Sequence, residues 1–221
     1  MEQKGPLDLG LKTLEDLNVV RHNEYRFISS DFGFVNSFRK MEANLFAIGQ
    51  PYRIKEGRAA FVKNGTARIL INLIEYTIQR NHFAVITPNS IVQITEVSPD
   101  FDMQMIAIDQ AFLPISGKED LFSYLLHHQR NILLVLSPQE LLQAENYFTL
   151  MWNILQETTF RRDAIRHLLA SLLYYIEYVA QSNMLMNPIQ LTRQEDIFQR
   201  FISLVNAYSK KERNVDFYAD K

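Results

Sequence analysis

The sequence predicts an α+β protein in which a β sandwich or barrel is followed by helices. From about Tyr25 to Phe112, short runs rich in Val, Ile, Phe and Thr are separated by turn signals about every eight to twelve residues. Near Leu136 the apolar period changes to three and four residues, which is the spacing of amphipathic helices. With 221 residues and 47% hydrophobic content, the chain has enough apolar side chains for an ordinary core.

Two hairpins are predicted in the first part of the chain. Residues 59–63 and 66–73 flank Asn64-Gly65, a pair that suits the positive φ angles of a two-residue type I′ turn. Residues 83–86 and 91–94 flank a turn that contains Pro88 and predict a second hairpin.

Two long helices are predicted next. Ser137 is a suitable N-cap, with proline at the first helical position and Glu140 in the first turn. After residues 161–163, a second helix carries a wide apolar stripe, which must be covered on two sides. We expect a second copy of the chain to cover one side. The alternative is a two-sided fit between the barrel and the neighbouring helix or the final helix. The residues predicted for this dimer interface are Ile165, Leu168, Leu169, Leu172, Leu173, Ile176 and Val179.

The last part of the chain predicts a linker and two further helices. Residues 184–193 contain Pro188 and break the helical period. Residues 194–213 form an amphipathic segment with Lys210, Lys211 and Arg213 at its end, where cations oppose the helix dipole. A second helix is expected to open at Asn214 and to be cut off after about one turn, well below independent stability.

This ending resembles the start of the DNA-binding head of AraC-type bacterial transcription regulators, whose helix-turn-helix often opens with a sequence such as Phe217-Tyr218-Ala219-Asp220-Lys221. The order of turn signals, from Gly57 through Asn64-Gly65 and Arg80-Asn81 to Pro88-Asn89, resembles the cupin-like sensing barrel of the same family. Two departures are present, because residues 80–82 replace the usual Pro-Gly-Asp and residues 87–89 replace the usual Pro-Pro-Gly.

The resemblance implies an α+β fold with a cupin-like barrel, a dimerisation helical pair and a terminal helix. It implies an N-terminal arm over residues 1–24, a sensing barrel with a connecting segment over 25–136, dimerisation helices over 137–183, a linker over 184–193 and the first part of a truncated DNA-binding domain over 194–221. The chain would be the sensing and dimerisation region of a cytoplasmic one-component regulator: a homodimer that binds a small-molecule effector and contacts DNA through a head beyond this chain. No DNA-binding residue is then expected within the 221 residues.

Charge and composition agree with that expectation. A net charge of −2 argues against a standing DNA-binding surface, which the missing head explains. The chain has no cysteine, which excludes a disulfide framework. Neither a secretory signal nor an apolar run long enough to span a membrane is found, so no membrane partner is expected.

A small barrel holds one small molecule or fills with side chains, so polar residues on apolar strands are the candidate ligand contacts. An outward-facing position is the alternative for each of them, because alternation alone does not tell which face is inside. Arg53 lies close to where the family's sensing arginine falls, and we expect a sugar-like effector. The candidates are Arg53, Arg58, Arg68, Asn72, Gln93 and Gln104.

No metal, cofactor or catalytic site is predicted. His82 is the one histidine of the expected barrel and has no partner at ligand spacing, and no catalytic motif is found. The alternative to a regulator is a stand-alone non-metal cupin that acts as an isomerase-like enzyme or a binding protein.

Overall fold

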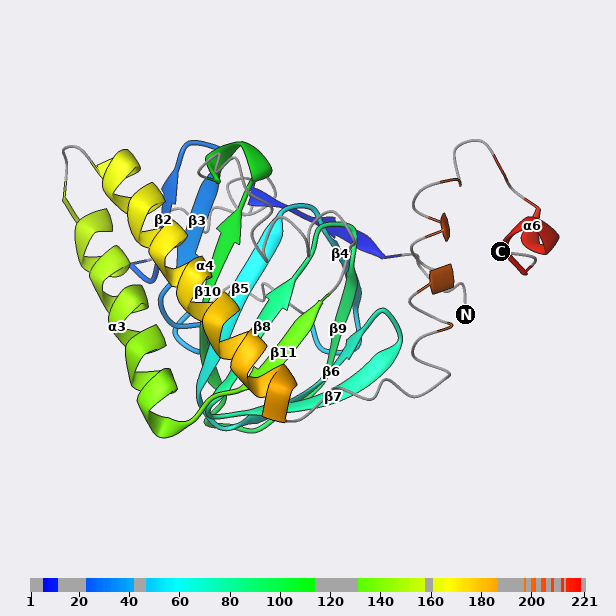
Figure 1. Ribbon diagram of the computed structural model, residues 1–221, viewed down its shortest axis with the longest axis horizontal. Coiled ribbons are helices and arrows are strands. Elements are labelled where there is room, and N and C mark those ends of the chain that lie inside the picture. The colour runs from blue at the N-terminus through cyan, green and yellow to red at the C-terminus, as the bar shows by residue number, and fades with distance from the viewer. Residues whose placement is uncertain are drawn as a thin grey trace.

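The computed structural model confirms the α+β class and places two β-sheets before two long helices (Figure 1). It describes residues 6–11, 23–41, 47–113, 131–157 and 161–186, together with 197, 200, 201, 204, 205, 208, 212 and 214–219.

The strands form two sheets between which the chain crosses several times. The first, sheet A, has the order β1-β4-β9-β6-β7, and the second, sheet B, has the order β11-β8-β5-β10-β3-β2. Within the described residues no strand pair joins the sheets, so the expected barrel takes the form of an open sandwich compatible with a cupin-like jelly roll. The strands of sheet A are β1 (Leu7–Leu9), β4 (Pro51–Ile54), β6 (Thr66–Ile71), β7 (Ile74–Gln79) and β9 (Ile91–Val97). Those of sheet B are β2 (Tyr25–Ile28), β3 (Phe32–Val35), β5 (Gly57–Asn64), β8 (His82–Ile86), β10 (Asp102–Ile108) and β11 (Ile132–Val135).

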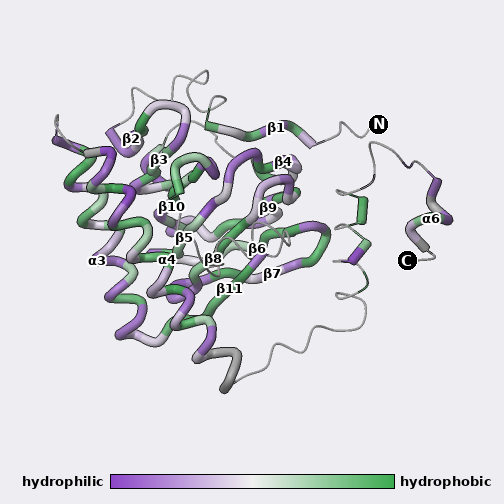
Figure 2. Tube along the Cα trace, turned by 45° about the horizontal axis from the view of Figure 1, so that its top comes forward, coloured by the Kyte–Doolittle hydropathy of each residue, from purple (hydrophilic) through white to green (hydrophobic). Residues whose placement is uncertain are grey.

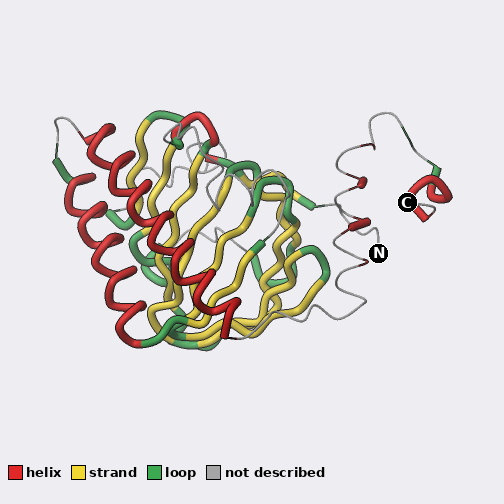
Figure 3. Tube along the Cα trace, viewed as in Figure 1, coloured by secondary structure: helices red, strands yellow, loops and turns green. Residues whose placement is uncertain are grey.

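Sheet B is the middle layer of three. One face packs against sheet A, and the other is covered by α3 (Pro138–Leu155) and α4 (Arg161–Met186), as Figure 3 shows. Along β5, Ala59 and Phe61 face the helices, whereas Ala60 and Val62 face sheet A. Both faces of β5 are therefore apolar, and the hydrophobic residues gather along the strands of the middle layer in Figure 2.

Neither predicted hairpin forms. β5 pairs with β8 and β10, whereas β6 pairs with β7 and β9, so the chain leaves one sheet for the other at Asn64-Gly65. Residues 87–90 make a second crossing of this kind, because β8 belongs to sheet B and β9 to sheet A. At the first crossing, the Asn64-Gly65 turn still requires glycine, because the φ of Gly65 is +69° and an added Cβ would lie 2.6 Å from backbone atoms of Phe101. The turn signals were placed correctly, but the strand partners were wrong.

The two-residue hairpin turn lies instead between β6 and β7, at Asn72-Leu73. Both residues have positive φ angles, 51° and 70°, which is the pattern of a type I′ turn. Leucine is an unusual residue for that conformation, which explains why the sequence pattern did not reveal the turn.

The helix predictions are confirmed. The Ser137 side chain accepts from the Glu140 amide, and the Glu140 carboxylate accepts from the Ser137 amide, which makes a complete capping box at the start of α3. At the centre of α3, Phe148 meets the rings of Phe34, Phe61 and Phe83 at centroid distances of 5.5, 4.9 and 6.3 Å. These edge-to-face contacts join the helix to three strands of sheet B.

The terminal segment is helical at every described position from 197 to 208, and α6 (Val215–Ala219) follows it. The ring of Tyr208 packs on Phe217 at 5.4 Å, and that of Phe201 packs on Tyr218 at 6.0 Å. The expected second helix at Asn214 is thus confirmed. α4 ends at Met186, three residues into the predicted linker, and the rest of the linker lies outside the described residues. None of the described helices is both long and apolar enough to cross a membrane.

Candidate functional site

A cavity of about 70 Å³ lies between the two sheets. Its wall contains apolar side chains from both sheets and one charged residue, Arg58 of β5. Ala60 and Ala84 are direct cross-strand partners on β5 and β8, and both face this space. Since alanine is the smallest side chain of the wall, this pair accounts for part of the empty volume.

Arg58 is buried with only 2% of its surface exposed. Its Nη2 donates to the Glu56 carboxylate at 3.1 Å and to the Leu9 carbonyl at 3.4 Å. Its Nη1 donates to the carbonyls of Glu56 and Gly57 at 3.3 and 3.4 Å. Nε has no hydrogen-bond partner among the described residues, so one N–H of the guanidinium is unused.

The electrostatic balance around Arg58 follows from its burial. Burial lowers the pKa of the guanidinium, and the neighbouring Glu56 carboxylate opposes part of that effect. The Arg58–Glu56 ion pair is almost wholly desolvated, with side-chain exposures of 3% and 13%. Such a pair is stable only where further hydrogen bonds satisfy its atoms, as they do here on every guanidinium nitrogen except Nε.

The N-terminal segment lies against the Arg58–Glu56 ion pair. β1 runs parallel to β4, and the Leu9 carbonyl accepts from the Lys55 amide at 3.0 Å. The Leu11 amide donates to the other oxygen of Glu56 at 3.0 Å. Leu11 is buried and lies so close to Gly33 that a Cβ there would collide with it. The same ion pair therefore joins Arg58 of the cavity wall to the N-terminal segment.

Of the six predicted ligand contacts, Arg58 alone lies on this cavity. Arg53 and Arg68 point to solvent in sheet A, where they meet Asp8 at 3.8 Å and Glu96 at 3.4 Å. Their neighbours Tyr52 and Ile69 are buried, so the inward positions of both strands are apolar.

The other three predicted contacts hold the backbone or another side chain. Asn72 accepts from the Ile91 amide at 2.9 Å, and Gln93 donates to the Gly49 carbonyl at 2.9 Å. Gln104 is buried, but it lies on the helix-facing side of β10, which Ile106 shares, and it donates to Asn36 at 2.6 Å. Sequence reasoning missed the apolar wall, including Ala60, Ala84 and Met105, because those residues look like ordinary core.

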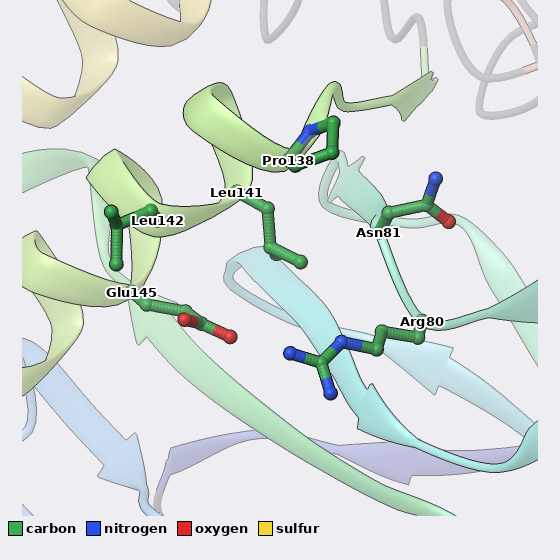
Figure 4. Close-up of a pocket in the computed structure, with 6 residues that line it drawn as sticks. All are labelled: Arg80, Asn81, Pro138, Leu141, Leu142 and Glu145. Carbon is green, nitrogen blue, oxygen red and sulfur yellow. The ribbon is translucent and has the colours of Figure 1, made fainter.

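A second, larger hollow of about 450 Å³ lies on the surface between the β7–β8 turn and the start of α3 (Figure 4). Arg80 and Glu145 point toward one another across it, as Figure 4 shows. Neither charge makes an ion pair within the described part of the chain. The hollow is open and its floor belongs to the core, so nothing in it singles out a ligand.

The described residues hold no group of three or more histidine, cysteine, aspartate or glutamate side chains that could bind a metal. His82 Nδ1 lies 3.1 Å from the Gln79 carbonyl, a local turn contact. The arrangement best suits binding of a small, mostly apolar molecule in the interior.

The residues predicted for a dimer interface lie inside the single chain. Ile165, Leu169, Leu172, Ile176 and Val179 are at most 2% exposed and pack in the core beneath the helices. Leu168 and Leu173 are partly buried against the same core. This is the fit between the barrel and a neighbouring helix that the sequence left open, and an interface with a second copy would have to use other residues.

No protein-family model and no curated protein matches the chain. Among solved structures, it is similar to an apo form of ToxT from Vibrio cholerae strain SCE256, with 12% identity over 88% of this chain and 71% of that one and a TM-score of 0.40. It is similar to the AraC-like transcriptional activator CuxR, with 9% identity over 86% of this chain and 65% of that one and a TM-score of 0.45. ToxT with an unsaturated fatty acid bound gives 12% identity over 79% and 65% and a TM-score of 0.37.

The chain thus spans about two thirds of the length of these structures. CuxR is described as a member of the family that the sequence resembles. Because the identities and TM-scores are low, we take no functional conclusion from the likenesses.

Proposed function

We propose that the chain is the ligand-sensing and dimerisation region of a one-component transcription regulator. The observation that carries this proposal is the cavity between the sheets, whose wall is apolar apart from the buried Arg58. Binding needs such a site, whereas catalysis needs acid, base or nucleophilic groups around a reacting atom. Among the described residues of the cavity wall, Arg58 is the one that carries a charge.

The C-terminal segment supports a DNA-binding partner domain. The short helix α6 contains Phe217, Tyr218 and Ala219 of the segment that resembles the first helix of the helix-turn-helix. The rings of Phe217 and Tyr218 pack on the preceding helical residues. A head that continued from there would bind DNA, and a regulator of chromosomal genes works in the cytoplasm.

The apolar wall of the cavity does not suit the sugar-like effector that we expected from the sequence. A sugar carries a hydroxyl on nearly every carbon, and the apolar wall would leave most of them without hydrogen bonds, at a cost of about 1–3 kcal/mol each. A solved ToxT structure carries an unsaturated fatty acid. A cavity of about 70 Å³ cannot hold an acyl chain of that kind without separation of the sheets.

The outer surface of α3 and α4 is the dimer face we propose. Every exposed position of α3 is uncharged, and the same holds for α4 from His167 to Gln181. Four large side chains stand on this surface, which we call the outer helical face: Leu142, Leu150, Tyr174 and Tyr178, at 54%, 47%, 53% and 67% exposure. Depletion of charge and enrichment in aromatic residues are typical of the centre of a protein–protein interface.

A fusion tests the proposal. The 221-residue chain is joined to a DNA-binding head that occupies its paired operator only when two copies are held together, and operator occupancy is read from a reporter gene. We expect occupancy with the natural chain and its loss with the double substitution Leu150→Glu and Tyr174→Glu. The matched control is Thr77→Glu with Gln79→Glu, which adds the same charge at exposed polar positions of β7 in sheet A, away from the helices. A fusion that leaves the operator empty although it is folded would contradict the proposal.

A further inference from the structure

The cavity between the sheets offers a ligand no hydrogen bond. Although Arg58 belongs to its wall, no nitrogen or oxygen atom of the described residues is exposed inside it. The guanidinium is directed at Glu56, Gly57 and Leu9, and its Nε is buried. Arg58 therefore takes part in the wall through its aliphatic stem. Provided that this cavity is the effector site proposed above, apolar contacts alone select the effector.

Water is a poor occupant of such a space. Buried water molecules typically make about three hydrogen bonds to polar groups of the protein. A water molecule in this cavity would make none, because the atoms exposed in it belong to alkyl, aromatic and thioether groups. Apolar cavities of this kind stay dry and take up apolar species such as benzene or xenon.

The empty space lies against two small side chains of the middle layer. Ala60 and Ala84 are cross-strand partners on β5 and β8, and each keeps part of its surface uncovered. On the other face of the same strands, Phe61 and Phe83 are buried beneath the helices. Sheet B is therefore closely packed on its helical side and incompletely packed toward sheet A, where a ligand would complete the missing contacts.

The volume limits the size of that ligand. An apolar cavity of about 150 Å³ holds benzene, which has six non-hydrogen atoms. The cavity here has about 70 Å³, roughly half as much, so about three or four non-hydrogen atoms fill it.

From the apolar wall and the volume, we propose that the cavity binds a small hydrocarbon of about three or four carbon atoms that carries no polar group. Its carbon atoms pack against Ala60, Ala84 and Met105 of sheet B and against the isoleucines of sheet A that line the cavity. A carbonyl, hydroxyl or carboxylate group in the same place would lose its hydrogen bonds to water and gain none in return. The site therefore rejects polar molecules of the same size.

Isobutene and acetone make a matched pair of probes, because they share one branched skeleton and differ only in a CH₂ group that replaces the oxygen atom. The full chain is labelled on its alanine and methionine methyl groups, and each probe is titrated while methyl NMR signals are followed. We expect isobutene to shift the signals of Ala60, Ala84 and Met105 in a saturable manner and to bind at least about tenfold more tightly than acetone.

Filling the cavity provides the control. Ala84→Val occupies part of the space and should abolish the saturable shifts of Ala60 and Met105. Ala111→Val, at an exposed alanine outside the cavity, should leave them unchanged. Ala60→Val is a second filling variant should Ala84→Val fail to fold.

The proposal is overturned by acetone binding as tightly as isobutene, by the absence of saturable shifts, or by shifts that persist in the filled variants. Binding of isobutene by a chain that fails the operator test would uphold this inference and refute the regulator function alone. A chain that passes the operator test and does not bind isobutene would overturn this inference alone.

Discussion

At the scale of single residues, conformations that few side chains adopt mark the places where the backbone is most constrained. Gly65 combines a left-handed φ with close approach of the β9–β10 turn. Gly49 has a left-handed φ of +81° but nothing within 4 Å of its missing Cβ. Alanine substitutions at these two glycines therefore separate the free-energy cost of a left-handed φ from the cost of a steric clash at the added Cβ.

We therefore expect Gly65→Ala to lower the free energy of unfolding by about 2–4 kcal/mol, because it adds a clash with the backbone of Phe101 to the left-handed cost. Gly49→Ala, with the left-handed cost alone, should lose about 1–2 kcal/mol. Urea unfolding of both variants provides the measurement. Equal losses would show that the turn around Phe101 moves aside.

Leu73 offers the opposite case. It has a φ of 70° and is 74% exposed, so the strained conformation gains no burial in return. Leu73→Gly should raise the free energy of unfolding by about 1 kcal/mol, because glycine adopts this φ without strain. Leu73→Ala keeps the Cβ and should give little or no gain. If alanine stabilised as much as glycine, the exposed leucine side chain would be the source of the cost.

Tyr175 is expected to make the free energy of unfolding depend on pH. Burial raises the pKa of its phenol, with Glu140 adding to the effect, and its hydroxyl donates to the Glu140 carbonyl at 3.5 Å. The phenol ionises near pH 10 in the unfolded chain and at higher pH in the folded one, so the stability it contributes is complete below about pH 10 and is lost as the pH rises through the folded pKa. Denaturant unfolding across that window should show a steeper fall for the natural chain than for Tyr175→Phe. Tyr178→Phe, at a 67% exposed position, should behave like the natural chain.

At the scale of elements, the aromatic contacts of α3 hold the helical layer on sheet B. Phe148→Ala should lower the free energy of unfolding by about 3–5 kcal/mol, because it removes a fully buried ring that meets three others. Thr149→Ala, at the next and exposed position, should change stability by less than about 0.5 kcal/mol. A small loss for Phe148→Ala would mean that α3 is held elsewhere, for example by Trp152, whose ring lies 5.4 Å from that of Phe34 and 5.3 Å from the Arg26 guanidinium.

The elements differ in how far their sequence determines them. The capping box at Ser137 and the apolar period place α3 to within a residue, because both are local interactions along one helix. The turn at Asn64-Gly65 is also local, but the partner of the strand that follows it is set by long-range contacts that no short motif encodes. The two hairpin predictions were wrong for that reason.

The candidate site was predictable in part on the same grounds. Arg68 stands between Ala67 and Ile69, and Gln93 between Val92 and Ile94, so their outward direction follows once these apolar neighbours are known to face the core. Arg58 sits on β5, where both faces are apolar, and only the placement of sheet A on one side and helices on the other shows which way it points.

At the scale of the whole molecule, the division between core and outer helical face leads to a test that separates folding from assembly. Leu172 is fully buried beneath α4, so Leu172→Glu should unfold the chain whether or not it dimerises. Tyr174 is 53% exposed on the same helix, so the double substitution with Leu150 should leave the fold intact and separate the copies. Far-ultraviolet circular dichroism reports folding, and sedimentation velocity reports the mass of the assembly.

We expect the natural chain to sediment as a dimer and the double variant as a folded monomer, because two carboxylates on each copy would have to be buried in the interface. A natural chain that sediments as a monomer at every concentration would remove the dimer from the proposed function. A double variant that remains a dimer would move the interface away from the outer helical face, and the surface hollow between Arg80 and Glu145 would be the next place to substitute.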